Sequence, residues 1–162
     1  MAHPKELSLA QLMNLMPQVG QVTWIGIRPE KRGQMEEVQE VKVSLEEGLM
    51  GDHYRGSREK KRQVTLIQEE HIATISSILG MASLSPTLLR RNIVVKGINL
   101  LALKNKSFQI GEVILEMTGA CHPCTRMEED LGPGGYNAVR GHGGITARVR
   151  QGGSIRLGDS VR

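Results

Sequence analysis

Apolar residues recur with a helical period near the start of the chain. In "SLAQLMNLM" they fall three and four positions apart, as on one face of a helix. Ser8 is placed to cap the first turn, and Pro17 prevents the helix from continuing. The pattern predicts a short N-terminal helix over residues 8–16.

From Val19 onward the period changes to two, which is typical of strands with one buried face. Such strands are predicted in "QVTWIGI", "VKVSL", "QVTLI" and "FQIGEVILEMTG". Helical spacing returns in "EEHIATISSILG" and in one turn at the start of "SPTLLRRNIVVKGINL", which continues as a strand. The tail "ITARVRQGGSIRLGDSVR" predicts a hairpin or a pair of short strands. Closely spaced short strands and 19 glycines favour an all-β barrel with helical insertions.

Length and composition fit a single domain spanning residues 1–162. A chain of 162 residues buries roughly two-thirds of its unfolded surface, so the fold does not need cysteines as cross-links. The sequence has only one Trp, one Phe and two Tyr, so aromatic platforms for single-stranded nucleic acid are scarce. We therefore expect a core of aliphatic residues and no nucleic-acid partner.

The formal net charge is +4, and many cationic residues fall in two clusters. Such clusters attract anions, although a solvated basic face that keeps the protein in solution fits the first cluster as well. The first comprises Arg55, Arg58, Lys60, Lys61 and Arg62, and the second comprises Arg140, Arg148, Arg150, Arg156 and Arg162.

Membrane insertion and secretion are not predicted. No run approaches the roughly 18 consecutive apolar residues of a membrane span, and the N-terminus lacks the pattern of a signal peptide. We expect a cytoplasmic protein whose thiols stay reduced.

Both cysteines lie in "TGACHPCTRMEEDLG", residues 118–132. The C-x-x-C spacing fits a thiol–disulfide pair, but no βαβ unit of the kind that carries such pairs is predicted. It also fits half of a zinc site completed by two of His53, His122 and His142. Alternatively, one cysteine is a nucleophile, sulfur carrier or soft-metal ligand, and the other packs as a small apolar residue.

Five segments, in this order, resemble the MOSC domain, the module named after the C-terminal part of molybdenum-cofactor sulfurase. The resemblance extends over about residues 20–162 and implies a mainly β fold, a single MOSC-type β-barrel with a few short helices. The segments are "GLMGDHYRG" at 48–56, "QVTLIQEE" at 63–70, "LRRNIVVKGINL" at 89–100, "CHPCTRM" at 121–127 and "GHGGITARVRQGGSIRLGD" at 141–159.

The resemblance implies one functional cysteine in a "PC" dipeptide, which is Cys124 here, and leaves Cys121 as a bystander. In this family that cysteine either ligates molybdenum in a molybdopterin-type cofactor, as in the amidoxime-reducing enzymes, or carries sulfur as a persulfide. A partly exposed, soft thiolate suits both roles.

The cofactor that the resemblance implies carries a phosphate, for which Arg91 and Arg140 are the candidate contacts. The alternatives are a structural salt bridge for Arg91 and plain surface exposure for Arg140. Asp52 could accept hydrogen bonds from pterin N–H groups, His53 could shuttle a proton, and Asn92 could orient either one. Alternatively, Asp52 caps its own turn and Asn92 ties strand edges together.

The sequence thus favours a molybdenum-cofactor-binding protein with Cys124 as the metal ligand, reducing N-hydroxylated or N-oxide substrates. Because no flavin or nicotinamide motif is present, an external electron-donor protein would be needed. A second hypothesis is a sulfur-transfer protein that receives a persulfide from a sulfur-donor protein for metal–sulfur cluster assembly. The third is a non-enzymatic module that binds zinc or an anion.

Overall fold

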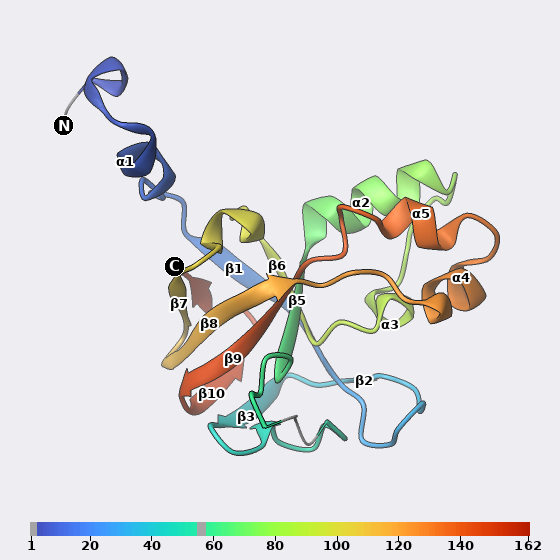
Figure 1. Ribbon diagram of the computed structural model, residues 1–162. Helices are drawn as coiled ribbons and strands as arrows, with labels where there is room; N and C mark the ends of the chain where they lie inside the picture. Colours follow the sequence, from blue (N-terminus) through green and yellow to red (C-terminus); the bar gives the residue numbers. More distant parts are fainter. Residues whose placement is uncertain (1–2, 55–57) are drawn as a thin grey trace.

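The computed structural model describes residues 3–54 and 58–162 (Figure 1). Its helices are short, as the sequence predicts. The α-helices are α1 (Leu9–Met13), α2 (Glu69–Ile78), α3 (Pro86–Leu89), α4 (Thr125–Leu131) and α5 (Gly135–Val139), and the 3-10 helices are η1 (Pro4–Glu6) and η2 (Leu100–Leu103). The strands are β1 (Gly20–Ile27), β2 (Glu36–Glu37), β3 (Glu40–Ser44), β4 (Gly48–Leu49), β5 (Val64–Gln68), β6 (Ile93–Lys96), β7 (Ser107–Ile110), β8 (Val113–Ala120), β9 (Ile145–Gln151), β10 (Gly153–Arg156) and β11 (Ser160–Val161).

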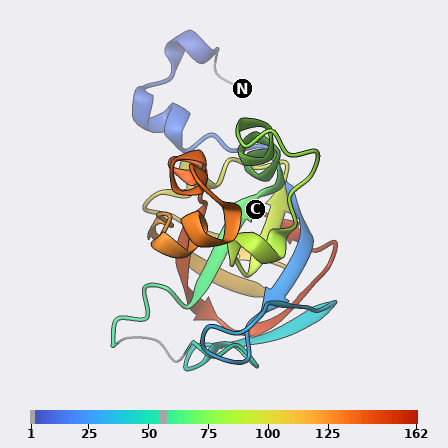
Figure 2. The same cartoon turned by 90° about the vertical axis from the view of Figure 1, so that its right-hand side faces the viewer.

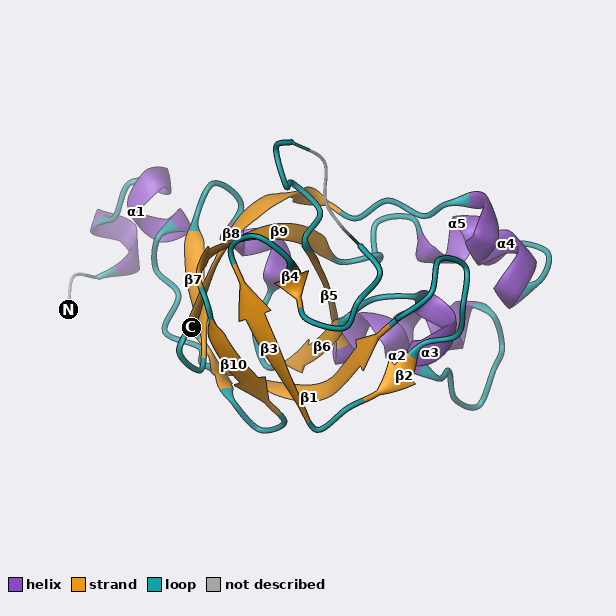
Figure 3. Cartoon of the chain, turned by 90° about the horizontal axis from the view of Figure 1, so that it is seen from below, coloured by secondary structure: helices purple, strands orange, loops and turns teal. Residues whose placement is uncertain are grey.

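The strands form one large and one small sheet, so the expected mainly β fold with a few short helices is confirmed. The large sheet has the order β11-β7-β8-β9-β5-β6-β1-β2, and the small sheet has the order β10-β3-β4. In addition, β11 pairs with the start of β1, so the hydrogen-bonded order leads from β1 around to β1 again (Figure 3). Strands β5 and β6 run parallel, with α2 and α3 in the connection between them.

The two faces of the central strands bury different clusters. On β1, Ile25 belongs to the main cluster between the strands, whereas Trp24 belongs to a second cluster under the helices. Leu66 and Ile67 divide in the same way on β5. The second cluster also holds Ile72 and Ile75 of α2, as well as residues of α3, α4 and α5. Helices α2 to α5 therefore form one layer at one end of the sheet (Figure 3).

The N-terminal helix is shorter than the residues 8–16 predicted from the pattern. Ser8 caps α1 as expected, but the helix ends with Asn14 as its C-cap, before Pro17 is reached. None of its residues is buried, and the segment projects away from the sheet (Figures 1 and 2). Of the predicted apolar stripe only Met16, beyond the end of α1, packs against the main cluster, so burial does not stabilise further helical turns.

The C-terminal tail forms separate strands, as one of the two alternatives predicted, and not a hairpin. After β9 the chain turns through Gly152, and β10 pairs with β3, Ile155 opposite Val41. The strand after it, β11, joins the large sheet. Within residues 3–54 and 58–162, no helix has the length and apolar character that crossing a membrane would require.

The close crossing of the "GHGG" loop over β5 generates a stability prediction. Gly144 has φ +86°, and a Cβ atom there would overlap the carbonyl oxygen of Leu66. We expect Gly144→Ala to lower the free energy of unfolding by about 3 kcal/mol or more, because the backbone itself must shift. The control is Gly141→Ala, which shares a positive φ of +82° but has open space around it and should cost about 1 kcal/mol. Urea unfolding measures both, and equal losses would contradict the steric explanation.

Candidate functional site

An arginine-lined cavity of about 140 Å³ lies where the large sheet meets the helical layer. Arg28 enters it from the end of β1, and Arg62 from the segment before β5. Arg90 and Arg91 come from the connection between α3 and β6, and Cys121 follows β8. Residues far apart in the sequence are therefore brought together because the ends of β1 and β8 and the start of β6 meet at this edge.

Arg91 is the most deeply buried of the four arginines, with 6% of its surface exposed. Its guanidinium donates to three backbone carbonyls: Nε to Gly143 O (2.7 Å), Nη1 to Leu89 O (2.9 Å) and Nη2 to Cys121 O (3.4 Å). Burial lowers the pKa of Arg91, whereas the nearby thiols of Cys121 and Cys124 act in the opposite direction. Among the described residues, Arg91 therefore binds backbone carbonyls and does not form the salt bridge that the sequence suggested. These contacts hold the loop of Gly143 against the cysteine segment.

The other arginines add positive charge around the same cavity. Burial lowers the pKa of Arg28, and the positive charge of Arg90 lowers it further. Arg62 Nη2 lies 4.0 Å from Cys121 Sγ, and Arg90 forms an ion pair of 3.6 Å with Asp130. Four guanidiniums converging on one small cavity repel one another, and an anion would relieve that repulsion.

Asp52 and His53 fix the turn beside Arg28. Asp52 Oδ1 accepts a hydrogen bond from the backbone N–H of Arg28 (2.7 Å), and Oδ2 accepts one from Tyr54 N (3.4 Å). The predicted capping of the turn by Asp52 is thus observed. His53 Nδ1 lies 3.5 Å from Arg28 Nε and 3.1 Å from Arg28 O, so the imidazole tautomer decides which of these contacts is a hydrogen bond. His53 therefore has a fixed position at the cavity wall.

Asn92 joins three segments through its side-chain amide. Its Oδ1 accepts from Thr65 N (3.2 Å) and Thr65 Oγ1 (3.0 Å), and its Nδ2 donates to Gly26 O (3.1 Å). The amide thus links β1, β5 and the start of β6, which agrees with the strand-tying alternative. Asn92 also lines the cavity, so this tie shapes the wall directly.

The two cysteines have contrasting environments. Cys121 is 3% exposed and lines the cavity, whereas Cys124 is exposed and is the N-cap residue of α4. Burial lowers the pKa of Arg28 and of Arg91, and the interaction with Cys124 opposes this shift in both. The structure therefore places the expected bystander against the arginines, and the expected functional thiol in a position open to solvent.

Arg140 lies outside the cavity. Its guanidinium donates to Asn137 Oδ1 (3.3 Å) and the residue is exposed, as the surface alternative predicted. His122 is exposed as well, and across residues 3–54 and 58–162 no group of three or more His, Cys, Asp or Glu side chains is arranged to hold a metal ion. The zinc hypothesis therefore gains no support from the geometry.

Three of the four arginines that line the cavity were missed as site residues by sequence reasoning: Arg28, Arg62 and Arg90. Arg62 was noted only as a member of a basic cluster, of which Arg55 lies outside the described residues. The available signals were weak: Arg28 directly follows a strand, and Arg90 precedes Arg91 in "RRNI". Only the tertiary structure shows that these side chains share a cavity.

Two histidine rings pack against each other beside the loop that contacts Arg91. The rings of His71, on α2, and His142 meet edge to face with centroids 5.4 Å apart. Burial lowers the pKa of His71, the positive charge of His142 lowers it further, and Glu70 opposes the shift. The same loop supplies the carbonyl of Gly143 to Arg91 and the carbonyl of Gly144 to Cys121 N (2.8 Å).

Comparison with known proteins identifies the class to which this fold and site belong. Residues 46–162 match the family model of the MOSC domain. The chain therefore belongs to the MOSC domain family, whose members are associated with molybdenum-cofactor-related functions. A comparison with curated proteins gives no match.

Solved structures with the same fold include three bacterial proteins. The YuaD protein from Bacillus subtilis has a TM-score of 0.78 at 18% identity, with 91% of this chain and 97% of that chain covered. YiiM from Geobacillus stearothermophilus has a TM-score of 0.68 at 16% identity, covering 88% of this chain and 73% of that one. YiiM from Escherichia coli has a TM-score of 0.66 at 15% identity, covering 88% and 68%. At these identities the likeness concerns the fold.

The His71–His142 pair predicts a pH dependence of stability. Because the pKa of His71 is lowered in the folded state, the unfolded chain takes up more protons below the ordinary pKa of about 6.5. The free energy of unfolding should therefore decrease as the pH is lowered from about 7.5 through this window, and it should decrease less steeply in the His71→Gln variant. Urea unfolding at a series of pH values measures the slope, with His122→Gln, at an exposed ring, as the control. An identical slope in His71→Gln and the unsubstituted protein would contradict the prediction.

Proposed function

We propose that this protein binds a molybdopterin-type molybdenum cofactor, with Cys124 as the molybdenum ligand, and reduces N-hydroxylated or N-oxide substrates. The observation that carries the proposal is the convergence of four arginines on a cavity that Cys121 lines, close in sequence to the exposed Cys124, in a chain of the MOSC family. The ring of strand pairings supports the MOSC-type barrel, and residues 1–162 would act as one domain with its MOSC-like part over about 20–162. We place the protein in the cytoplasm, where both thiols stay reduced.

The residues present fit such a group chemically. A soft thiol suits molybdenum, and Cys124 is exposed, so a metal can reach it. Guanidiniums are good donors to phosphate oxygens, and Arg62 and Arg28 are available at the cavity. Pockets that enclose whole cofactors usually measure about 300–1,000 Å³. At about 140 Å³, this cavity fits an anionic group of the cofactor and not the complete pterin.

When bound, the group would supply the two-electron chemistry at the metal. The chain's own residues would bind and orient the reactants and move a proton. Reduction of an N-hydroxyl group to an amine consumes two electrons, provided by an external donor protein, and two protons, and releases water. His53 could deliver a proton, because its ring is fixed beside Arg28 at the cavity wall.

A second candidate function is persulfide transfer. The exposure of Cys124 favours it, since a sulfane sulfur must be reachable by both a donor and an acceptor protein. In that case the arginines would bind an anionic part of the partner or product. The third hypothesis, a zinc- or anion-binding module, retains only its anion-binding part from the geometry.

The first experiment distinguishes these functions through the composition of the protein. The protein is purified without reductant from a host that makes molybdenum cofactor and is then examined by native mass spectrometry and elemental analysis. We expect stoichiometric molybdenum with a pterin mass, lost in Cys124→Ser and largely retained in Cys121→Ser. Arg28→Gln combined with Arg62→Gln should lower pterin retention about tenfold, because two charged donors are removed.

Other compositions would contradict the reductase proposal. One additional sulfur on Cys124 without metal would establish the carrier function. Equal loss of molybdenum in both cysteine variants would require a two-thiol ligand set, and stoichiometric zinc would overturn both candidate functions.

A further inference from the structure

A second hollow, which we call the basic groove, lies on the other side of the segment that carries Arg62. It measures about 450 Å³ and is bordered by residues 58–61, the turn after β3 and the later part of β9. Among the described residues, it shares no lining residue with the arginine-lined cavity. The basic groove is thus a distinct surface feature that the proposed function leaves unused.

The basic groove carries a surplus of positive charge. Two acidic side chains, Glu46 and Glu59, line it. Among residues 3–54 and 58–162 the surplus amounts to three charges, because the cationic side chains that line the groove are Arg58, Lys60, Lys61, Arg148 and Arg150.

Ion pairs neutralise only part of this charge. Lys60 pairs with Glu46 at 3.1 Å, and Lys61 pairs with Glu59 at 2.7 Å. The hydrogen bond from Lys61, together with its charge and that of Arg148, lowers the pKa of Glu59.

Two arginines of the groove remain without a carboxylate. Arg150 pairs with Glu116, outside the groove, whereas Arg58 and Arg148 form no ion pair within the described part of the chain. The Nε atom of Arg148 is moreover buried without a hydrogen-bond partner among the described atoms. Arg58 and Arg148 are therefore the cations best able to bind a carboxylate of another molecule.

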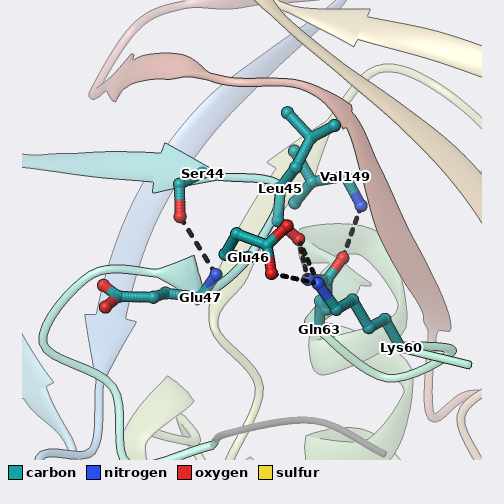
Figure 4. A network of polar contacts seen from close by, with 7 residues as sticks. All are labelled: Ser44, Leu45, Glu46, Glu47, Lys60, Gln63 and Val149. Atoms are coloured by element: carbon teal, nitrogen blue, oxygen red, sulfur yellow. Dashed lines mark hydrogen bonds and ion pairs between the residues drawn. The ribbon is translucent and has the colours of Figure 1, made fainter. Parts of the chain in front are cut away.

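The groove has a rigid floor (Figure 4). The side chain of Gln63, which is 3% exposed, donates from Nε2 to Leu45 O (2.8 Å) and accepts from Val149 N (2.8 Å) at Oε1. Lys60 Nζ donates to the same carbonyl of Leu45 at 3.1 Å. The turn after β3, the segment before β5 and β9 are thereby joined, so the backbone that carries the cations is held in place before any partner arrives. Such preorganisation lowers the entropic cost of binding.

We propose that the basic groove is the docking site for an acidic surface of a partner protein. Charge complementarity selects the sign of the partner, and unpaired arginines on a fixed frame give the directional donors that carboxylates accept in bidentate fashion. A nucleic acid fits less well, since none of the described residues that line the groove is aromatic and could stack on a base.

Docking at the basic groove would bring the partner close to the thiols. Lys61 lines the groove, whereas the next residue, Arg62, lines the cavity and contacts Cys121 Sγ. One short segment thus separates the docking surface from the site. The proposal itself requires neither a cofactor nor a reactive thiol, so it can hold even where the proposed function fails.

The test measures binding of a fluorescein-labelled, glutamate-rich peptide to the full chain by fluorescence anisotropy, at about 20 mM and about 150 mM salt. We expect Arg58→Gln combined with Arg148→Gln to weaken binding about tenfold, and added salt to weaken it further. The matched control is Lys31→Gln combined with Lys96→Gln, which removes the same charge at exposed positions outside the groove and should change affinity less than about twofold. Because Arg148 is partly buried, the exposed Arg58→Gln alone provides a second groove variant.

Two results would overturn the proposal. Equal weakening by the groove variant and the control variant would mean that only the overall charge attracts the peptide. Tighter binding of a single-stranded oligonucleotide of the same net charge would identify the groove as a nucleic-acid surface instead. Thermal unfolding of each variant confirms that the compared proteins are folded.

Discussion

The architecture of the site depends on one buried cation, the guanidinium of Arg91. A charged group with 6% exposure and, within the described part of the chain, no carboxylate partner would cost several kcal/mol if its hydrogen bonds were lost. Three backbone carbonyls satisfy it, and they belong to the end of α3, the loop before β9 and the cysteine segment. Arg91 therefore fixes the positions of Cys121 and of the "GHGG" loop together. Because carbonyl dipoles do not cancel its charge, it also leaves a positive potential in the cavity.

The distribution of charge also explains how the arginine-lined cavity and the basic groove can bind different kinds of ligand. In the cavity, four guanidiniums lie around a small volume and favour a compact anion. In the basic groove, the described cations outnumber the carboxylates over a larger volume and favour the broader acidic surface of a protein. Residues 58–62 contribute to both, because residues 58–61 line the groove and Arg62 lines the cavity, on a segment that turns at Lys60, where φ is 54°. A small ligand and a partner protein could thus be recognised side by side without competing for the same groups.

Local patterns predicted what depends on local sequence. The alternation in β1, β3, β5 and β8 gave the mainly β fold, and the capping functions of Ser8 and Asp52 were among the expectations. The pairing of β10 with β3 and the position of Cys121 against the cavity arginines could not be predicted, because each depends on contacts between distant segments. For the same reason, sequence reasoning proposed Arg140, next to a glycine motif, as a phosphate contact. It missed Arg28, which enters the cavity only because of where β1 ends. Periodicity specifies which face is buried, but not which strand edges meet.

The pairing of β11 with β1 sets a condition on how the protein acquires its structure. Gly20 lies opposite Val161, so this contact joins segments separated by nearly the whole length of the chain. Contacts of such high sequence separation form slowly, because a long loop must close first. During synthesis, β1 cannot pair with β11 until the strands between them have been made. Its edge stays unpaired until then, and an unpaired strand edge can pair with other chains.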